Sequence, residues 1–127
     1  MTVNLNHTIV AARDKQASAK FLADILGLQV SPQFGPFTPV EVPNGVTLDY
    51  METDGAITSQ HYAFLVSEDD FDAIFARIKD AGLTYWADPA HNRAGEINTN
   101  DGGRGTYFED PSGHNLEILT RPYGSGS

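Results

Sequence analysis

The chain has 127 residues, enough for one domain with a substantial hydrophobic core. Its 17 acidic and 8 basic residues give a formal net charge of −9, and a surface so negative argues against nucleic acid as a partner. The absence of cysteine excludes disulfides, thiolate metal sites and a cysteine nucleophile. No apolar run approaches the roughly 18 residues of a membrane helix and no signal peptide is visible, so a cytoplasmic protein without membrane contact is expected.

Two amphipathic helices are expected. The first begins after Asp14, a good N-cap residue, and ends at Gly27; the second begins after Ser67 and ends at Gly82. Apolar residues recur at helical spacing in both segments, at positions 17, 21, 22, 25 and 26 and at positions 71, 74, 75 and 78.

Short runs rich in β-branched and aromatic residues surround these helices and predict strands. One run precedes each helix, two follow the first helix and three follow the second. They span residues 5–11, 37–42, 46–51, 61–66, 83–86, 105–109 and 114–120.

The order of elements repeats along the chain. His61 follows His7 by 54 positions and Gly82 follows Gly27 by 55, whereas residues 111–117 follow the similar residues 43–49 by 68. Two copies of one βαβββ unit explain these offsets, with about 13 extra residues in the polar stretch 88–104 of the second copy. The sequence therefore predicts an α+β domain over residues 1–123, with modules at about 3–52 and 60–121 and a flexible tail at 124–127.

The repeat pairs His7 with His61 and Asp49 with Glu117. Side chains alternate along a strand, so each carboxylate points away from its apolar neighbours and toward the other face of its sheet. Two imidazoles and a carboxylate suit a divalent cation such as Zn, Ni, Co, Mn or Fe(II) and leave open positions for a substrate. His7, His61 and Glu117 are therefore the candidate metal ligands, and Asp49 is a weaker fourth candidate.

Other side chains supply candidate ligand contacts. Arg104 precedes the strand at 105–109 and is a candidate clamp for a carboxylate or phosphonate; Tyr107 is a candidate hydrogen-bond or proton donor. Phe37, Tyr50 and Trp86 are candidate stacking surfaces for a flat ligand. A surface role for the arginine and core roles for the aromatics remain open alternatives, and the remaining histidines, His91 and His114, are interpreted as structural or solvent-facing.

The chain resembles the vicinal oxygen chelate superfamily, which includes glyoxalases, bleomycin-resistance proteins and extradiol dioxygenases. The resemblance spans residues 3–121 and is most specific in the Phe-x-Asp-Pro-x-Gly-x-x-x-Glu signature that ends at Glu117. Further matching segments are Leu5-Asn6-His7, residues 21–28 and His61-Tyr62-Ala63-Phe64. This resemblance implies paired modules that curl into a half-open barrel around a central cleft, with His7, His61 and Glu117 at the positions of the metal ligands and Asp49 on the strand that supplies a fourth ligand in glyoxalase I-like members.

Three functional hypotheses follow from the ligand set and the resemblance. The first is a metal-dependent lyase, isomerase or transferase for a small oxygen-chelating substrate, in which Glu117, Asp49 or bound water handles protons. The second is an iron(II) dioxygenase, and the third is a non-catalytic protein that binds an antibiotic or another aromatic natural product. The family analogy also favours a homodimer.

Overall fold

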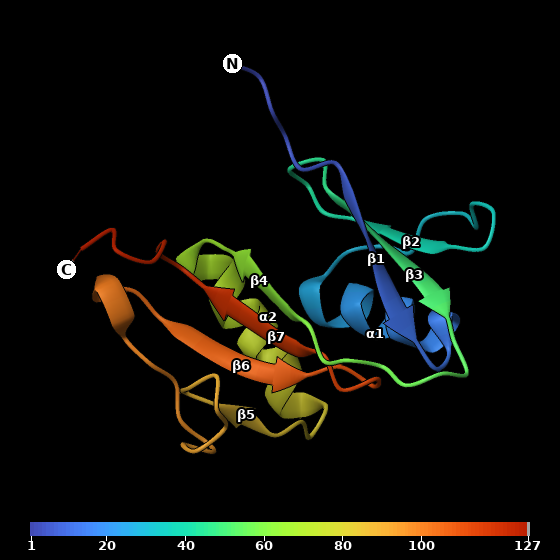
Figure 1. Cartoon of the computed structure of the whole chain (residues 1–127). Coiled ribbons are helices and arrows are strands. Elements are labelled where there is room, and N and C mark those ends of the chain that lie inside the picture. Colours follow the sequence, from blue (N-terminus) through green and yellow to red (C-terminus); the bar gives the residue numbers. More distant parts are fainter. Residues whose placement is uncertain (127) are drawn as a thin grey trace. The chain divides into compact units, whose positions relative to one another are not determined.

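In the computed structural model, which describes residues 1–126, the chain divides into two compact units, Met1–Thr58 and Ser59–Ser127, called unit 1 and unit 2 below. Unit 1 contains β1 (His7–Ala12), α1 (Lys15–Leu26), β2 (Thr38–Glu41) and β3 (Thr47–Glu52). Its sheet has the order β1-β3-β2, with β1 parallel and β2 antiparallel to β3. Helix α1 covers one face of this sheet (Figure 1).

Unit 2 repeats this arrangement with an additional strand. It contains β4 (His61–Leu65), α2 (Glu68–Asp80), β5 (Tyr85–Trp86), a 3-10 turn η1 (Asn100–Gly102), β6 (Gly105–Glu109) and β7 (Asn115–Leu119). The sheet order is β4-β7-β6-β5, with β4 parallel to β7 and the other pairs antiparallel. Helix α2 lies behind the sheet (Figure 1). In each unit the sheet face turned away from the helix is called the open face below.

Both helices begin at the predicted caps. The side chain of Asp14 accepts a hydrogen bond from the backbone N–H of Ala17 at 3.1 Å, and Ser67 caps the backbone N–H of Asp70 at the same distance. Gly27 ends α1 with φ +75°, a left-handed conformation that glycine adopts without strain.

Strand register confirms the predicted repeat. Pro39 lies opposite Asp49 in unit 1, and Tyr107 lies opposite Glu117 in unit 2, so both pairs are related by the offset of 68 that the turns predict. The α+β fold of two paired modules is thus confirmed. Unit 1 differs in having, in place of a strand equivalent to β5, only a single bridge between Val30 and Val40.

Alternation along the central strands places the apolar side chains on the helix side of each sheet. In unit 1 these are Leu48 and Tyr50, with exposed fractions of 3% and 1%, and in unit 2 they are Leu116 and Ile118. Helix residues complete the two cores, among them Ala19, Leu22, Phe71, Ile74 and Ile78. In the part of the chain that the structure describes, neither helix has the length and apolar character needed to span a bilayer.

Candidate active site

The open face of the unit 2 sheet carries the polar side chains of the predicted site. Strand register aligns Glu117 of β7, Tyr107 of β6 and Trp86 of β5 in one row. Ala63 of β4 belongs to the same row, and His61, two positions earlier on that strand, shares its face. Strand pairing therefore brings together two predicted ligands that are 56 positions apart in the chain.

The geometry of His61 and Glu117 fits two ligands of one cation. Nδ1 of His61 lies 2.9 Å from the carbonyl oxygen of Asn115, and Nε2 lies 3.0 Å from Oε1 of Glu117. The carbonyl can only accept, so Nδ1 carries a proton and Nε2 is the ring nitrogen that faces the carboxylate. Nε2 and Oε1 at 3.0 Å can share a proton or a cation, and an imidazole nitrogen with a carboxylate oxygen is a donor pair that suits a divalent cation.

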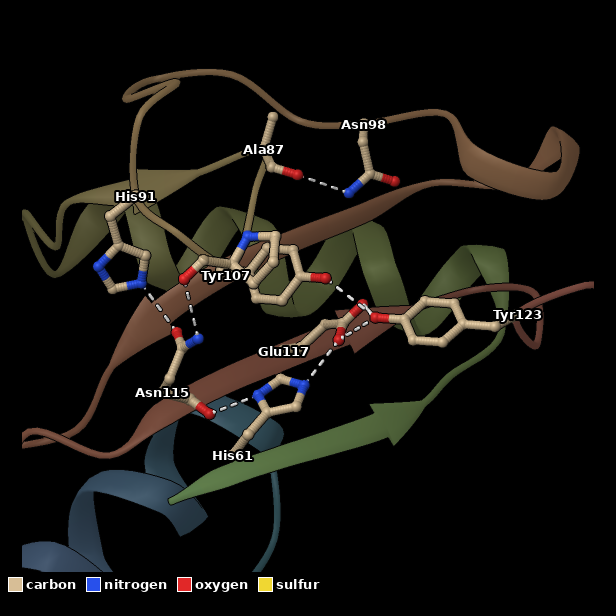
Figure 2. Close-up of polar contacts among 9 residues, drawn as sticks. His61, Ala87, His91, Asn98, Tyr107, Asn115, Glu117 and Tyr123 are labelled. Carbon is tan, nitrogen blue, oxygen red and sulfur yellow. Dashed lines mark hydrogen bonds and ion pairs between the residues drawn. The ribbon is translucent and has the colours of Figure 1, made fainter. Parts of the chain in front are cut away.

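The carboxylate of Glu117 is buried, with 1% of its side chain exposed, and two phenols lie over it. The hydroxyl of Tyr123 donates to the carboxylate at 2.6 Å from Oε1 and 2.7 Å from Oε2. The hydroxyl of Tyr107 lies 2.9 Å from that of Tyr123, and Figure 2 shows His61 and both phenols pointing toward the carboxylate. Burial raises the pKa of both tyrosines above the ordinary value of 10, so each keeps its proton and serves as a donor.

Tyr123 is the member of this group that the sequence did not indicate. It follows β7, outside the superfamily signature and just before residues expected to form a tail without a role. A lone tyrosine in a Gly- and Ser-rich end has no periodicity or spacing that points to a carboxylate. Only the course of the chain after β7 reveals the contact.

The long loop between β5 and β6 lies beside this group. Its His91 stacks on Trp86 with ring centroids 3.7 Å apart and an interplanar angle of 3°. His91 Nε2 also lies 2.9 Å from the side-chain oxygen of Asn115 (Figure 2). The backbone N–H groups of Asn92 and Arg93 donate to Asp88, and the first of these contacts is the main reason that the pKa of Asp88 lies below its ordinary value.

The open face of unit 1 contains the other two members of the predicted constellation. A groove of about 520 Å³ is lined by both His7 and Asp49, together with Phe37, which the sequence singled out as a ligand contact. Nδ1 of His7 lies 2.7 Å from the side-chain oxygen of Asn6, so the ring is oriented by an acceptor as His61 is. The other lining residues are Asn6, Ser31, Pro32, Phe34, Pro39, Glu41 and Thr47.

The structure does not bring Arg104 or Tyr50 to an open face. The guanidinium of Arg104 is bound to α2, with Nε 2.8 Å from Glu68 and Nη1 2.8 Å from Asp72, and it lies over the ring of Phe71. Position 104 has the strand parity of the helix-facing residues of β6, which is why its side chain turns toward α2. Tyr50 is 1% exposed in the core of unit 1, as the alternation around Asp49 requires.

His114 has a structural role, in agreement with the interpretation from the sequence. Its side chain is 1% exposed, and its Nδ1 accepts a hydrogen bond from the backbone N–H of Gln60 at 3.0 Å. The ring also contacts Tyr62 edge-on at 5.9 Å. This histidine therefore joins the start of β4 to the turn before β7.

Among the residues that the structure describes, no three His, Asp or Glu side chains gather into a group that could hold a metal ion. His61 and Glu117 supply two donors, and His7 belongs to unit 1. The three-ligand set consequently stays a prediction, although the orientation of each imidazole suits it.

The sequence profile of the Glyoxalase/Bleomycin resistance protein/Dioxygenase superfamily matches residues 4–118. The chain therefore belongs to this superfamily, as its motifs indicated.

Individual relatives include enzymes of two kinds. The chain is 33% identical over 126 residues to the glutathione transferase FosA of Serratia marcescens, a match that covers 93% of this chain and 81% of FosA. Among solved structures, Oxidase ChaP-H2 is 80% identical with a TM-score of 0.98 and full coverage of both chains. Oxidase ChaP-H1 is 63% identical with a TM-score of 0.94, covering 97% of this chain and 99% of that one. These matches indicate an enzyme of the superfamily.

Proposed function

We propose that this protein is a divalent-metal-dependent oxidase that acts on a small molecule with adjacent oxygen atoms. The main support for an oxidase is that the chain is 80% identical, over the full length of both chains, to Oxidase ChaP-H2. The sequence alone favoured a lyase, isomerase or transferase over an iron(II) dioxygenase, whereas the two oxidase matches support an oxidative reaction.

The proposed ligand set is His7, His61 and Glu117. Two histidines and one carboxylate are the usual set of non-haem iron(II) oxygenases, and a cation bound there supplies Lewis acidity and open positions for oxygen ligands. The carbonyl of Asn115 orients His61 so that Nε2 presents its lone pair. The charge of buried Glu117 offsets that of the cation.

The residues around the ligand set bind and orient the substrate. Tyr107 retains its proton and lies near the carboxylate as a hydrogen-bond donor, while Phe37 offers an apolar wall in the unit 1 groove. Asp49 lines the same groove and keeps its predicted role in handling protons. Trp86 stacks on His91, so one face of its indole is already covered.

A transferase is the second candidate, because FosA matches nearly the whole chain. The charges of the residues that line the groove argue against a transferase with an anionic substrate. No Lys or Arg is among the described residues that line the unit 1 groove, whereas Glu41 and Asp49 both are, and the guanidinium of Arg104 is paired with two acids of α2. A phosphonate would find no cationic side chain in this groove to add to the charge of the metal, so a substrate without strong negative charge is favoured.

Elemental analysis and oxygen uptake test this proposal. We expect near-stoichiometric divalent metal in the wild type, loss of that metal in His61→Ala, and oxygen consumption by iron(II)-loaded protein with ortho-dihydroxyaromatic or α-hydroxyketone probes. Loss of glutathione thiol with fosfomycin, without oxygen uptake, would favour the transferase. A metal-free protein that nevertheless binds aromatic antibiotics would restore the non-catalytic hypothesis.

A homodimer also remains part of the proposal, on the analogy with the superfamily. Light scattering coupled to size-exclusion chromatography would contradict it by giving a mass near 13.8 kDa.

A further inference from the structure

The segment that follows β7 supplies one member of the polar group around Glu117, the phenol of Tyr123. Figure 2 shows the phenol of Tyr123 reaching back over β7 to Glu117. The two residues are only six positions apart, but the contact requires the chain to turn after the strand. Tyr123 as a whole is 61% exposed. Its hydroxyl contacts a buried carboxylate, but much of the residue faces solvent.

The hydrogen-bond roles in this network follow from the number of protons. Tyr123 has a single hydroxyl proton, and both oxygens of Glu117 lie within 2.7 Å of it. That proton is shared by the carboxylate, so the hydroxyl of Tyr107 must donate to Tyr123. One phenol thus donates to both carboxylate oxygens, including Oε1, the oxygen that also faces Nε2 of His61.

The segment is held by a weak and separate anchor. The side chain of Asp101 accepts hydrogen bonds from the backbone N–H groups of Gly124 and Gly126, each at 3.2 Å. Asp101 has φ +57°, a left-handed conformation in the turn η1. Long hydrogen bonds between exposed groups contribute little to stability, so the anchor is one that can open without unfolding the sheet.

We propose that Tyr123 is a latch on the metal site: its hydroxyl competes with the divalent cation for Glu117 and thereby sets the affinity and the rate of metal binding. This inference rests on the proposed function, because it takes Glu117 as a metal ligand. Asp101 acts through Tyr123 as a positioning residue. The phenol is stabilised by the same carboxylate charge that would attract a cation, so metal binding at Glu117 and this hydrogen bond would oppose each other.

Calorimetric titration of the metal-free full-length protein with Co²⁺ tests the latch. Tyr123→Phe keeps the ring and removes the hydroxyl, and we expect Co²⁺ to bind about tenfold more tightly, the factor that corresponds to one charge-assisted hydrogen bond. Asp101→Gly removes the anchor without backbone strain and should tighten binding by a smaller factor. Tyr85→Phe is the control, because that ring packs edge-on against Phe75 of α2 and should leave the affinity unchanged.

The outcomes separate the latch from the proposed function. Equal or weaker binding by Tyr123→Phe, in a protein whose Glu117→Gln variant has lost Co²⁺ binding, overturns the latch and leaves the ligand assignment intact. Tighter binding by Tyr123→Phe without any oxygen uptake supports the latch and contradicts the oxidase. Co²⁺ binding by Tyr123→Phe but not by the wild type supports a latch that is fully closed, and binding by neither overturns it.

Discussion

The two units have the same strand register but use their open faces differently. In unit 1 the row that contains Asp49 continues into Pro39, and the face forms a groove. In unit 2 the equivalent row contains Glu117 and Tyr107, and the carboxylate is closed in by His61 and Tyr123. The repeated strands form a common framework that holds these side chains at equivalent positions.

Two segments of unit 2 outside the common framework account for this difference. The loop between β5 and β6 brings His91 against Trp86 and Asn115, and the segment after β7 brings Tyr123 to Glu117. The loop is about 13 residues longer than its counterpart in unit 1, and Tyr123 corresponds, at the offset of 68, to Gly55. The duplicated strands therefore position the predicted ligands, and the added segments determine the surroundings of the carboxylate.

The largest expected effect is on metal affinity, when the carboxylate of Glu117 is substituted and compared with the same change at the equivalent Asp49. Glu117→Gln removes a charged ligand and leaves a buried amide, so we expect metal affinity to fall at least about 100-fold, since even outer-shell changes cost 10- to 100-fold. Asp49→Asn, the matched change in unit 1, should have a much smaller effect. Calorimetric titration with Co²⁺ measures both, and equal losses would contradict the different roles assigned to the two positions.

The helix side of unit 2 should contribute to stability and not to catalysis. Arg104→Gln removes ion pairs with Glu68 and Asp72, whose carboxylates are largely exposed, so we expect a loss of about 1 kcal/mol in the free energy of unfolding. Metal affinity and oxygen uptake should not change. Urea denaturation measures the first quantity; lost activity in a folded variant would return Arg104 to the substrate site.

The smallest expected effect is the acid sensitivity of the inserted loop. The backbone N–H of Asn92 helps to hold the pKa of Asp88 below its ordinary value of 3.8. The carboxylate therefore stabilises the loop fully above that pH and loses its contribution as the pH falls through the lowered pKa. Fluorescence of Trp86, the only tryptophan of the chain, should report this change because His91 stacks on it.

Asp88→Asn should remove the acid transition, and the unit 1 variant Asp49→Asn should not. A transition that persists unchanged in Asp88→Asn would show that another group controls the loop.

The sequence by itself determined the helices, the strands, the repeat and the superfamily, because these depend on local signals. Asp14 and Ser67 identify helix starts by their own side chains, and alternation predicted that Leu116 and Ile118 would be buried while Glu117 faced the other way. The offset of 68 even located the inserted loop before any strand pairing was known.

Tertiary structure alone decided which side chains meet that carboxylate and which do not. Tyr123 has no local signature, Arg104 is bound by acids of α2 that lie 32 and 36 positions earlier, and His91 stacks on Trp86 from an inserted loop. A side chain's neighbours depend on how distant segments pack, whereas caps and strand alternation depend on the few residues on either side. For that reason the sequence predicted two partners at the centre of unit 2, and the fold added the phenol that donates to the carboxylate.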